Sequence, residues 1–69
     1  METFSLEKKN HIELSKLLRK LDISLSKSAA EDLIIGKQVS VNGITEIREH
    51  VKISFGDTVE VKGHQIMIE

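Results

Sequence analysis

The chain of 69 residues contains no cysteine, proline, tryptophan or tyrosine, and only two phenylalanines. Without cysteine, no disulfide supports the core and no thiolate is available for metal or redox chemistry. Proteins that bind unstructured single strands of nucleic acid stack bases on exposed rings, so the scarcity of aromatic residues disfavours that class. The length fits one domain, near the lower limit at which a single core suffices.

The chain also lacks an excess of charge and a long apolar run. Ten basic and eleven acidic residues give a formal net charge of −1. Nucleic-acid binders are usually basic, so only a local cluster of charge could support that function. The longest apolar run, Leu33-Ile34-Ile35, is far too short to span a bilayer, and the N-terminus has no secretory pattern. We therefore expect a cytoplasmic protein with no membrane partner.

The first half of the chain predicts two short helices. Between residues 13 and 21, leucines recur at the spacing of one helical face and basic residues occupy the opposite face. The leucines are Leu14, Leu17, Leu18 and Leu21, and the basic residues are Lys16, Arg19 and Lys20. From periodicity alone, these basic residues also fit the ordinary solvated face of an amphipathic helix.

The second predicted helix begins near residue 26 and runs to about Ile35. Ser26 and Ser28 are both candidate N-caps, and Ser28 has capping-box spacing to Glu31. Gly36 is placed to supply the left-handed residue that ends a helix. Alanines at positions 29 and 30 would let this helix approach the first one closely.

After Gly36 the apolar period changes to two, which indicates strands. Val39 and Val41 lead into the tight-turn pair Asn42-Gly43, and further strands are expected at 44–47, 51–53, 58–61 and 65–68. The expected buried face of the sheet comprises Val59, Val61, Ile66 and Ile68. Residues 1–11 form either an edge strand or a flexible end. The predicted class is α+β, with two packed short helices followed by a small, mainly antiparallel sheet.

Four short motifs in this order resemble a known family. They are Ile12–Leu18 (IELSKLL), Ser26-Lys27-Ser28 with Ala30, Val39–Gly43 (VSVNG) and Gly56-Asp57-Thr58-Val59. The combination resembles the RNA-binding domain named after ribosomal small-subunit protein four. The C-terminal part is similar to the small stand-alone members of the YbcJ and YaaA type. It carries Glu46, Arg48, Lys52 and Gly63. Residues 1–69 are accordingly expected to form one domain of this type.

The resemblance implies a small non-catalytic protein that binds structured RNA of the ribosomal or transfer RNA class. In this family two helices and the following turn read the shape and phosphates of RNA. No cofactor, metal or small-molecule substrate is implied. We expect a monomer that binds RNA either free or within a ribosomal particle. The implied RNA-binding residues are Lys16, Arg19, Lys20, Ser26, Lys27, Ser28, Lys37, Arg48 and Lys52.

Three positions depart from the family pattern and weaken the expected electrostatic attraction to RNA. Glu13 stands where many relatives have arginine, Lys27 replaces the usual arginine, and Glu31 takes a place that is often basic. An enzyme is disfavoured because the histidines at positions 11, 50 and 64 are dispersed and lack metal-ligand spacing. Each of the four glycines also marks a separate turn, so no phosphate-binding loop is present.

Two other functions remain open. One is a protein-interaction adaptor on the same fold, for which near-neutral charge is the main support; its candidate contacts are Glu31, Asp32, Glu46 and Glu49. The other is a targeting domain of a larger RNA-modifying enzyme. The initiating Met1 and the C-terminal segment ending at Glu69 disfavour that option.

Overall fold

The structure, a computed structural model, describes residues 2–69, so Met1 of the predicted N-terminal segment lies outside the described residues. Its elements are β1 (Glu2–Phe4), β2 (His11–Glu13), α1 (Leu14–Lys20), α2 (Lys27–Ile35), β3 (Val39–Val41), β4 (Ile44–Thr45), β5 (Lys52–Ser54), β6 (Thr58–Val61) and β7 (His64–Ile68). The predicted α+β class, with two helices and a mainly antiparallel sheet, is confirmed. Two short strands, β1 and β2, precede the helices in sequence.

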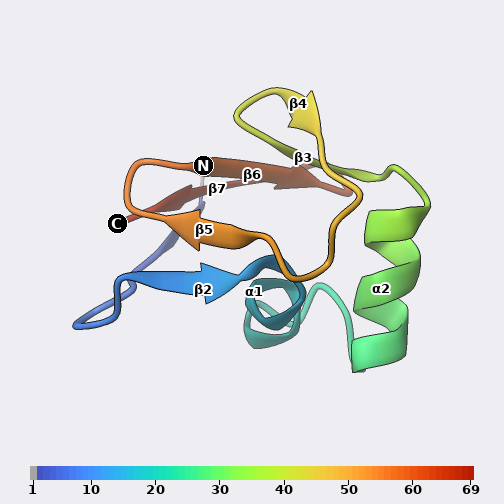
Figure 1. Ribbon diagram of the computed structural model, residues 1–69, viewed down its shortest axis with the longest axis horizontal. Helices are drawn as coiled ribbons and strands as arrows, with labels where there is room; N and C mark the ends of the chain where they lie inside the picture. Colours follow the sequence, from blue (N-terminus) through green and yellow to red (C-terminus); the bar gives the residue numbers. More distant parts are fainter. Residues whose placement is uncertain (1) are drawn as a thin grey trace.

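The strands form two sheets rather than the single sheet that we predicted. Five strands have the order β1-β7-β6-β3-β4, while β2 and β5 pair separately as an antiparallel ribbon. Within the larger sheet only the β1–β7 pair is parallel, which places the described N-terminal residues beside the last strand. Figure 1 shows α1 end-on below the strands and α2 upright beyond their ends. Residues 2–4 of the N-terminal segment thus form an edge strand, one of the two expected alternatives.

Helix α1 explains why the strand predicted at 44–47 ends early, at Thr45. The backbone N–H of Leu14 donates to the carbonyl of Val51 at 3.0 Å, and that of Ser15 donates to Glu49 at 3.1 Å. These carbonyls satisfy the first amides of a helix that has no side-chain cap. Residues 49–51 are therefore held against the start of α1, and β5 begins at Lys52, one residue later than predicted.

The core lies between the helices and the inner faces of both sheets. The predicted buried face of the main sheet is confirmed, because Val59, Val61, Ile66 and Ile68 are all at most 2% exposed. The helices contribute Leu14, Leu17, Leu18, Ala30, Leu33 and Ile34, and the ribbon contributes Ile12 and Ile53. Helix packing and sheet formation thus depend on one apolar cluster. Within residues 2–69, neither helix has the length and apolarity needed to cross a membrane.

The end of α2 differs from the prediction at Gly36. Gly36 has φ −73°, and the left-handed residue is Lys37, with φ 62°. The Lys37 N–H donates to Ile34 and the Gln38 N–H donates to the carbonyl of Leu33, both at 3.1 Å. This pair of hydrogen bonds defines a Schellman motif, which requires its left-handed residue one position beyond the helix cap. The prediction that Gly36 is the left-handed residue is therefore wrong by one position.

Replacing Lys37 by glycine should stabilise the protein. A side chain in the left-handed region costs about 1–2 kcal/mol, and glycine has no such cost. We expect Lys37→Gly to raise the free energy of unfolding by about 1 kcal/mol, which corresponds to roughly 4–8 °C in Tm for a domain of this size. Thermal unfolding followed by circular dichroism measures it. Lys37→Ala removes the same charge but keeps the strained backbone, and should show no gain. An equal gain in both variants would contradict the explanation.

Two of the family-like motifs contact each other in the fold. Asn42, in the β3–β4 turn, donates from Nδ2 to Asp57 Oδ1 at 3.0 Å and accepts from the Thr58 N–H at 2.9 Å. Asp57 Oδ2 also accepts from the Ser54 N–H at 2.8 Å. These bonds fasten the β3–β4 turn to the β5–β6 turn. The Asn-Gly and Gly-Asp motifs therefore have a structural role.

Candidate functional site

A basic hollow is formed by the exposed face of α1 and the loop that follows it. Its volume is about 450 Å³, and its lining includes Lys16, Arg19 and Lys20 together with Asp22, Ser24 and Leu25. The three basic side chains lie here because the leucines of α1 occupy the opposite, buried face of the helix. We call this feature the basic hollow.

Sequence reasoning missed a fourth basic residue beside this surface. Lys9 and Lys20 both line a neighbouring hollow of about 190 Å³ under the β1–β2 loop. The sequence pair Lys8-Lys9 was a signal of charge in the polar N-terminal segment. Lys9 lies next to α1 because the pairing of β2 with β5 positions the β1–β2 loop. This pairing joins residues far apart in the chain, so no local sequence pattern predicts it.

The loop after α1 contributes two unusual side chains to the basic hollow. Ser24 is 5% exposed, and its Oγ has no hydrogen-bond partner among residues 2–69. A buried hydroxyl without a partner costs about 1–3 kcal/mol, so such atoms are uncommon in folded proteins. The next residue, Leu25, is 94% exposed. The sequence signal for this exposure is an apolar residue between two serines in a polar connection.

The start of α2 adds further predicted residues near Leu25. Ser26 is the N-cap, because its Oγ accepts from the Ala29 N–H at 3.1 Å. The alternative cap, Ser28, is wrong, since Ser28 lies within the first helical turn and is exposed. Lys27 Nζ lies 3.9 Å from a carboxylate oxygen of Glu31, so this lysine already has an acidic neighbour. Both partners remain at the surface, where such a pair contributes little to stability.

Glu13 places a negative charge between several basic groups. Its carboxylate lies 3.3 Å from Lys16 Nζ and 2.6 Å from His50 Nδ1, and Lys52 is its paired residue on the neighbouring strand. The hydrogen bond with His50, followed by that with Lys16, lowers the pKa of the Glu13 carboxyl below its usual value. The carboxyl therefore loses its charge only at a lower pH than an ordinary glutamate. At neutral pH it opposes the positive charge of Lys16.

Arg48 is also paired with an acid. Its guanidinium donates to both carboxylate oxygens of Glu46, from Nη2 at 2.9 Å and from Nε at 3.2 Å. The hydrogen bond from Arg48 lowers the pKa of Glu46, and the same bond raises the pKa of Arg48. Arg48 lines a different hollow, beside Ile35 and Ile47.

The predicted site residues thus fall into separate groups. Lys16, Arg19 and Lys20 share the basic hollow, and the start of α2 follows directly from its loop. Lys37 lies past the other end of α2, a helix of nine residues and therefore about 14 Å in length. Arg48 and Lys52 belong to the loop and ribbon at the start of α1. The nine residues do not converge on one point.

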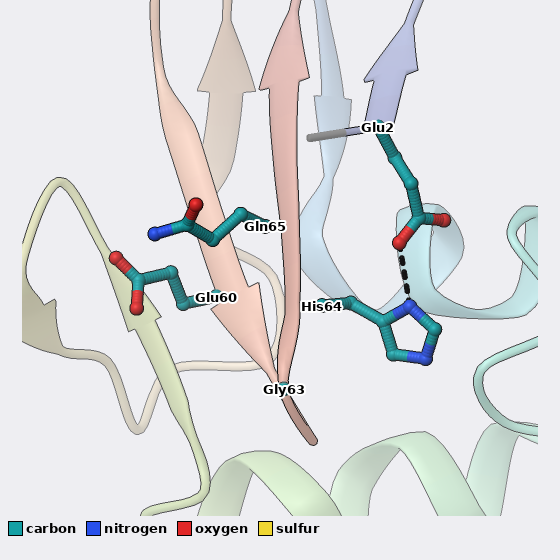
Figure 2. A pocket seen from close by; sticks show the side chains of 5 residues that line it. All are labelled: Glu2, Glu60, Gly63, His64 and Gln65. Carbon is teal, nitrogen blue, oxygen red and sulfur yellow. Dashed lines mark hydrogen bonds and ion pairs between the residues drawn. The ribbon is translucent and has the colours of Figure 1, made fainter.

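A hollow lined by residues of β1, β6 and β7 and by the β6–β7 turn has the opposite character. Figure 2 shows a hollow lined by Glu2, Glu60 and His64, in which His64 Nδ1 and Glu2 Oε2 are 2.5 Å apart. Glu60 alternates with the buried Val59 and Val61 along β6, so its side chain faces away from the helices. Two carboxylates disfavour a phosphate in this hollow.

Comparison with known proteins places this geometry in a family. The chain is 41% identical over 68 residues to YbcJ of Escherichia coli (strain K12), whose name describes it as a candidate RNA-binding protein. The match covers 99% of this chain and 97% of that protein. A YbcJ protein of Shigella flexneri matches to the same extent.

Two solved structures share the fold. The solution structure of E. coli YbcJ, described as revealing an ALFAL motif involved in RNA binding, matches with a TM-score of 0.74 and covers 99% of this chain and 86% of that chain. The 30S ribosomal protein S4e of Thermoplasma acidophilum matches with a TM-score of 0.70 and 24% identity, over 84% of this chain and 31% of that chain.

The sequence pattern of the S4 domain matches residues 4–69, which is nearly the whole chain. The resemblance drawn from the four motifs is therefore confirmed. By sequence and by fold, the chain belongs to the S4 domain family.

Proposed function

We propose that residues 1–69 act as one non-catalytic RNA-binding domain that recognises structured RNA of the ribosomal or transfer RNA class. The observation that carries this proposal is the shared position of Lys16, Arg19 and Lys20 around the basic hollow. Three cationic side chains on one rigid helix can contact successive phosphates, which supply most of the affinity in RNA recognition. The name and description of YbcJ support the same function.

The proposed binding surface extends from the basic hollow to the start of α2. Lys27 and the hydroxyls of Ser26 and Ser28 stand at the first turn of α2, where free N–H groups and the helix dipole favour a phosphate. Lys37, Arg48 and Lys52 are proposed as outer contacts, because they lie away from the hollow. The protein acts as a cytoplasmic monomer, on free RNA or within a ribosomal particle, and needs no cofactor.

A direct binding measurement tests this function. Purified protein is titrated into a fluorescently labelled folded RNA, such as a hairpin junction, and into an unstructured strand of the same length. Anisotropy should rise at low salt with the folded RNA and much less with the single strand. Stacking of successive bases needs several exposed rings, and among residues 2–69 Phe55 is the one strongly exposed aromatic side chain. No binding to the folded RNA at low salt would refute the function.

Removing the charge of Glu13 should strengthen RNA binding. In Glu13→Gln the shape of the side chain is kept, while Lys16 loses the carboxylate 3.3 Å away. We expect the affinity for folded RNA to rise about three- to tenfold at low salt, and the gain to shrink as salt screens the charges. Glu60→Gln changes the net charge equally on the far face of the sheet and should leave the affinity almost unchanged. Equal gains in both variants would show that only net charge matters.

The protein-interaction adaptor is a weaker candidate on this geometry. Three of its four proposed acidic contacts already have basic neighbours within the chain: Glu31 faces Lys27, Glu46 binds Arg48, and Glu49 lies 3.1 Å from His50 Nε2. A partner would have to displace these contacts. Of the nine proposed RNA-binding residues, Lys16, Lys27 and Arg48 have such an acidic neighbour within residues 2–69, so RNA phosphates would compete with a carboxylate there.

A further inference from the structure

Among residues 2–69, the most exposed large apolar side chain stands at the basic hollow. Leu25 is 94% exposed and lines the basic hollow with Lys16, Arg19 and Lys20. The other strongly exposed apolar residues lie elsewhere. Phe55 and Ile44 flank the turns joined by Asn42 and Asp57, and Ile35 and Ile47 line the hollow of Arg48.

A regular RNA helix offers little to an apolar side chain. Its outer surface consists of phosphates, ribose hydroxyls and base edges, because the faces of paired bases are stacked on one another. A nucleotide that leaves the stack exposes an apolar base face beside its own phosphate. Leucine next to cationic side chains matches that combination, in the way that apolar side chains contact unstacked bases in bent duplexes.

We propose that the basic hollow binds one unstacked nucleotide of a folded RNA, with its phosphate on the basic side chains and its base against Leu25. This inference rests on the proposed RNA-binding function and narrows its substrate to RNA with a bulge or an unpaired junction nucleotide. The volume of about 450 Å³ lies within the range of roughly 300–1,000 Å³ that is typical of small-ligand sites.

The polar lining of the hollow fits a nucleotide as well. Ser24 lines the hollow, and its Oγ is buried without a partner among residues 2–69. Asp22 also lines the hollow, and its carboxylate accepts hydrogen bonds from a 2′-hydroxyl or a base N–H. The same negative charge disfavours a second phosphate, which limits the site to a single nucleotide.

Two hairpins that differ only in one bulged nucleotide test the proposal. The bulge carries 2-aminopurine, whose fluorescence reports its stacking, and the second hairpin has the same base paired. Wild-type protein should bind the bulged RNA about tenfold more tightly, the factor expected from burying roughly 55 Å² of apolar surface. Leu25→Ser should lose this preference and keep the affinity for the paired hairpin. The control Phe55→Ser, an exposed apolar residue at a remote turn, should behave as wild type.

The possible failures are distinguishable. Equal wild-type affinity for the two hairpins, or an unchanged preference in Leu25→Ser, overturns the nucleotide site and leaves general RNA binding intact. Equal losses on both hairpins in Leu25→Ser overturn it too, because Leu25 then contributes to the paired helix. Absence of binding to either hairpin at low salt refutes the proposed function itself.

Discussion

Neutralising Arg19 and Lys20 together should reduce the affinity for folded RNA by about 10- to 100-fold at low salt. Both side chains are exposed and line the basic hollow. Neither is engaged by a carboxylate within 4 Å among residues 2–69, unlike Lys16, Lys27 and Arg48. Each is therefore available for a charge-assisted hydrogen bond to phosphate, and losing two such contacts costs affinity of this order. Anisotropy titrations of Arg19→Gln/Lys20→Gln against wild type measure the loss.

The matched control for this pair comes from the same set of predicted residues. Lys37→Gln/Lys52→Gln removes an equal charge, but neither residue lines the basic hollow. We expect this control to lose only a few-fold in affinity, because Lys37 and Lys52 are proposed as outer contacts away from the hollow. Circular dichroism spectra should be unchanged in both double variants. A loss in the control as large as that in the first pair would mean that the hollow is not the centre of binding.

The second large effect concerns stability. Leu17 is fully buried in the core, and Leu17→Ala should lower the free energy of unfolding by about 2–5 kcal/mol, through lost burial and the cavity left behind. A chain of 69 residues has a total stability of only about 3–10 kcal/mol. The variant is thus expected to be largely unfolded at moderate urea concentration. Urea denaturation followed by circular dichroism measures the change.

The same substitution at an exposed leucine provides the control. Leu25→Ala removes identical atoms from a side chain that is 94% exposed, so the expected change lies within about 0.5 kcal/mol. If Leu25→Ala destabilises the protein as much as Leu17→Ala, the loop after α1 is not the exposed element described above. If Leu25→Ala is as stable as wild type, a change in RNA binding at this position cannot be attributed to unfolding.

The elements that could be predicted are those set by local pattern. The leucine spacing of α1, the alternation in β6 and β7 and the Asn-Gly turn each involve residues close in sequence. The position of Ser26 as a cap followed from its residue type, although Ser28 competed with it on equal terms. The motifs that resembled the family were informative because they hold the fold together, as the contact of Asn42 with Asp57 illustrates.

The features that escaped prediction depend on contacts between distant residues. After β4 ends at Thr45, the carbonyls of Glu49 and Val51 bind the start of α1, which lies more than thirty residues earlier in the chain. The left-handed conformation of Lys37 follows from the Schellman hydrogen bonds, which prevailed over the lower cost of glycine one residue earlier. The pairing of Glu13 with His50 joins residues 37 positions apart. The sequence alone therefore could not predict which lysines are paired with a carboxylate, because this depends on the fold.

The salt dependence of RNA binding tests the central claim most directly. Binding of wild-type protein to a folded RNA is measured between about 50 and 200 mM salt, and the logarithm of the binding constant is plotted against the logarithm of the salt concentration. If Lys16, Arg19, Lys20 and Lys27 each neutralise a phosphate, the slope should be about −3 to −4. In Arg19→Gln/Lys20→Gln it should fall in magnitude to about half of that value. A slope near zero, or the same slope in both proteins, would contradict phosphate recognition by the basic hollow.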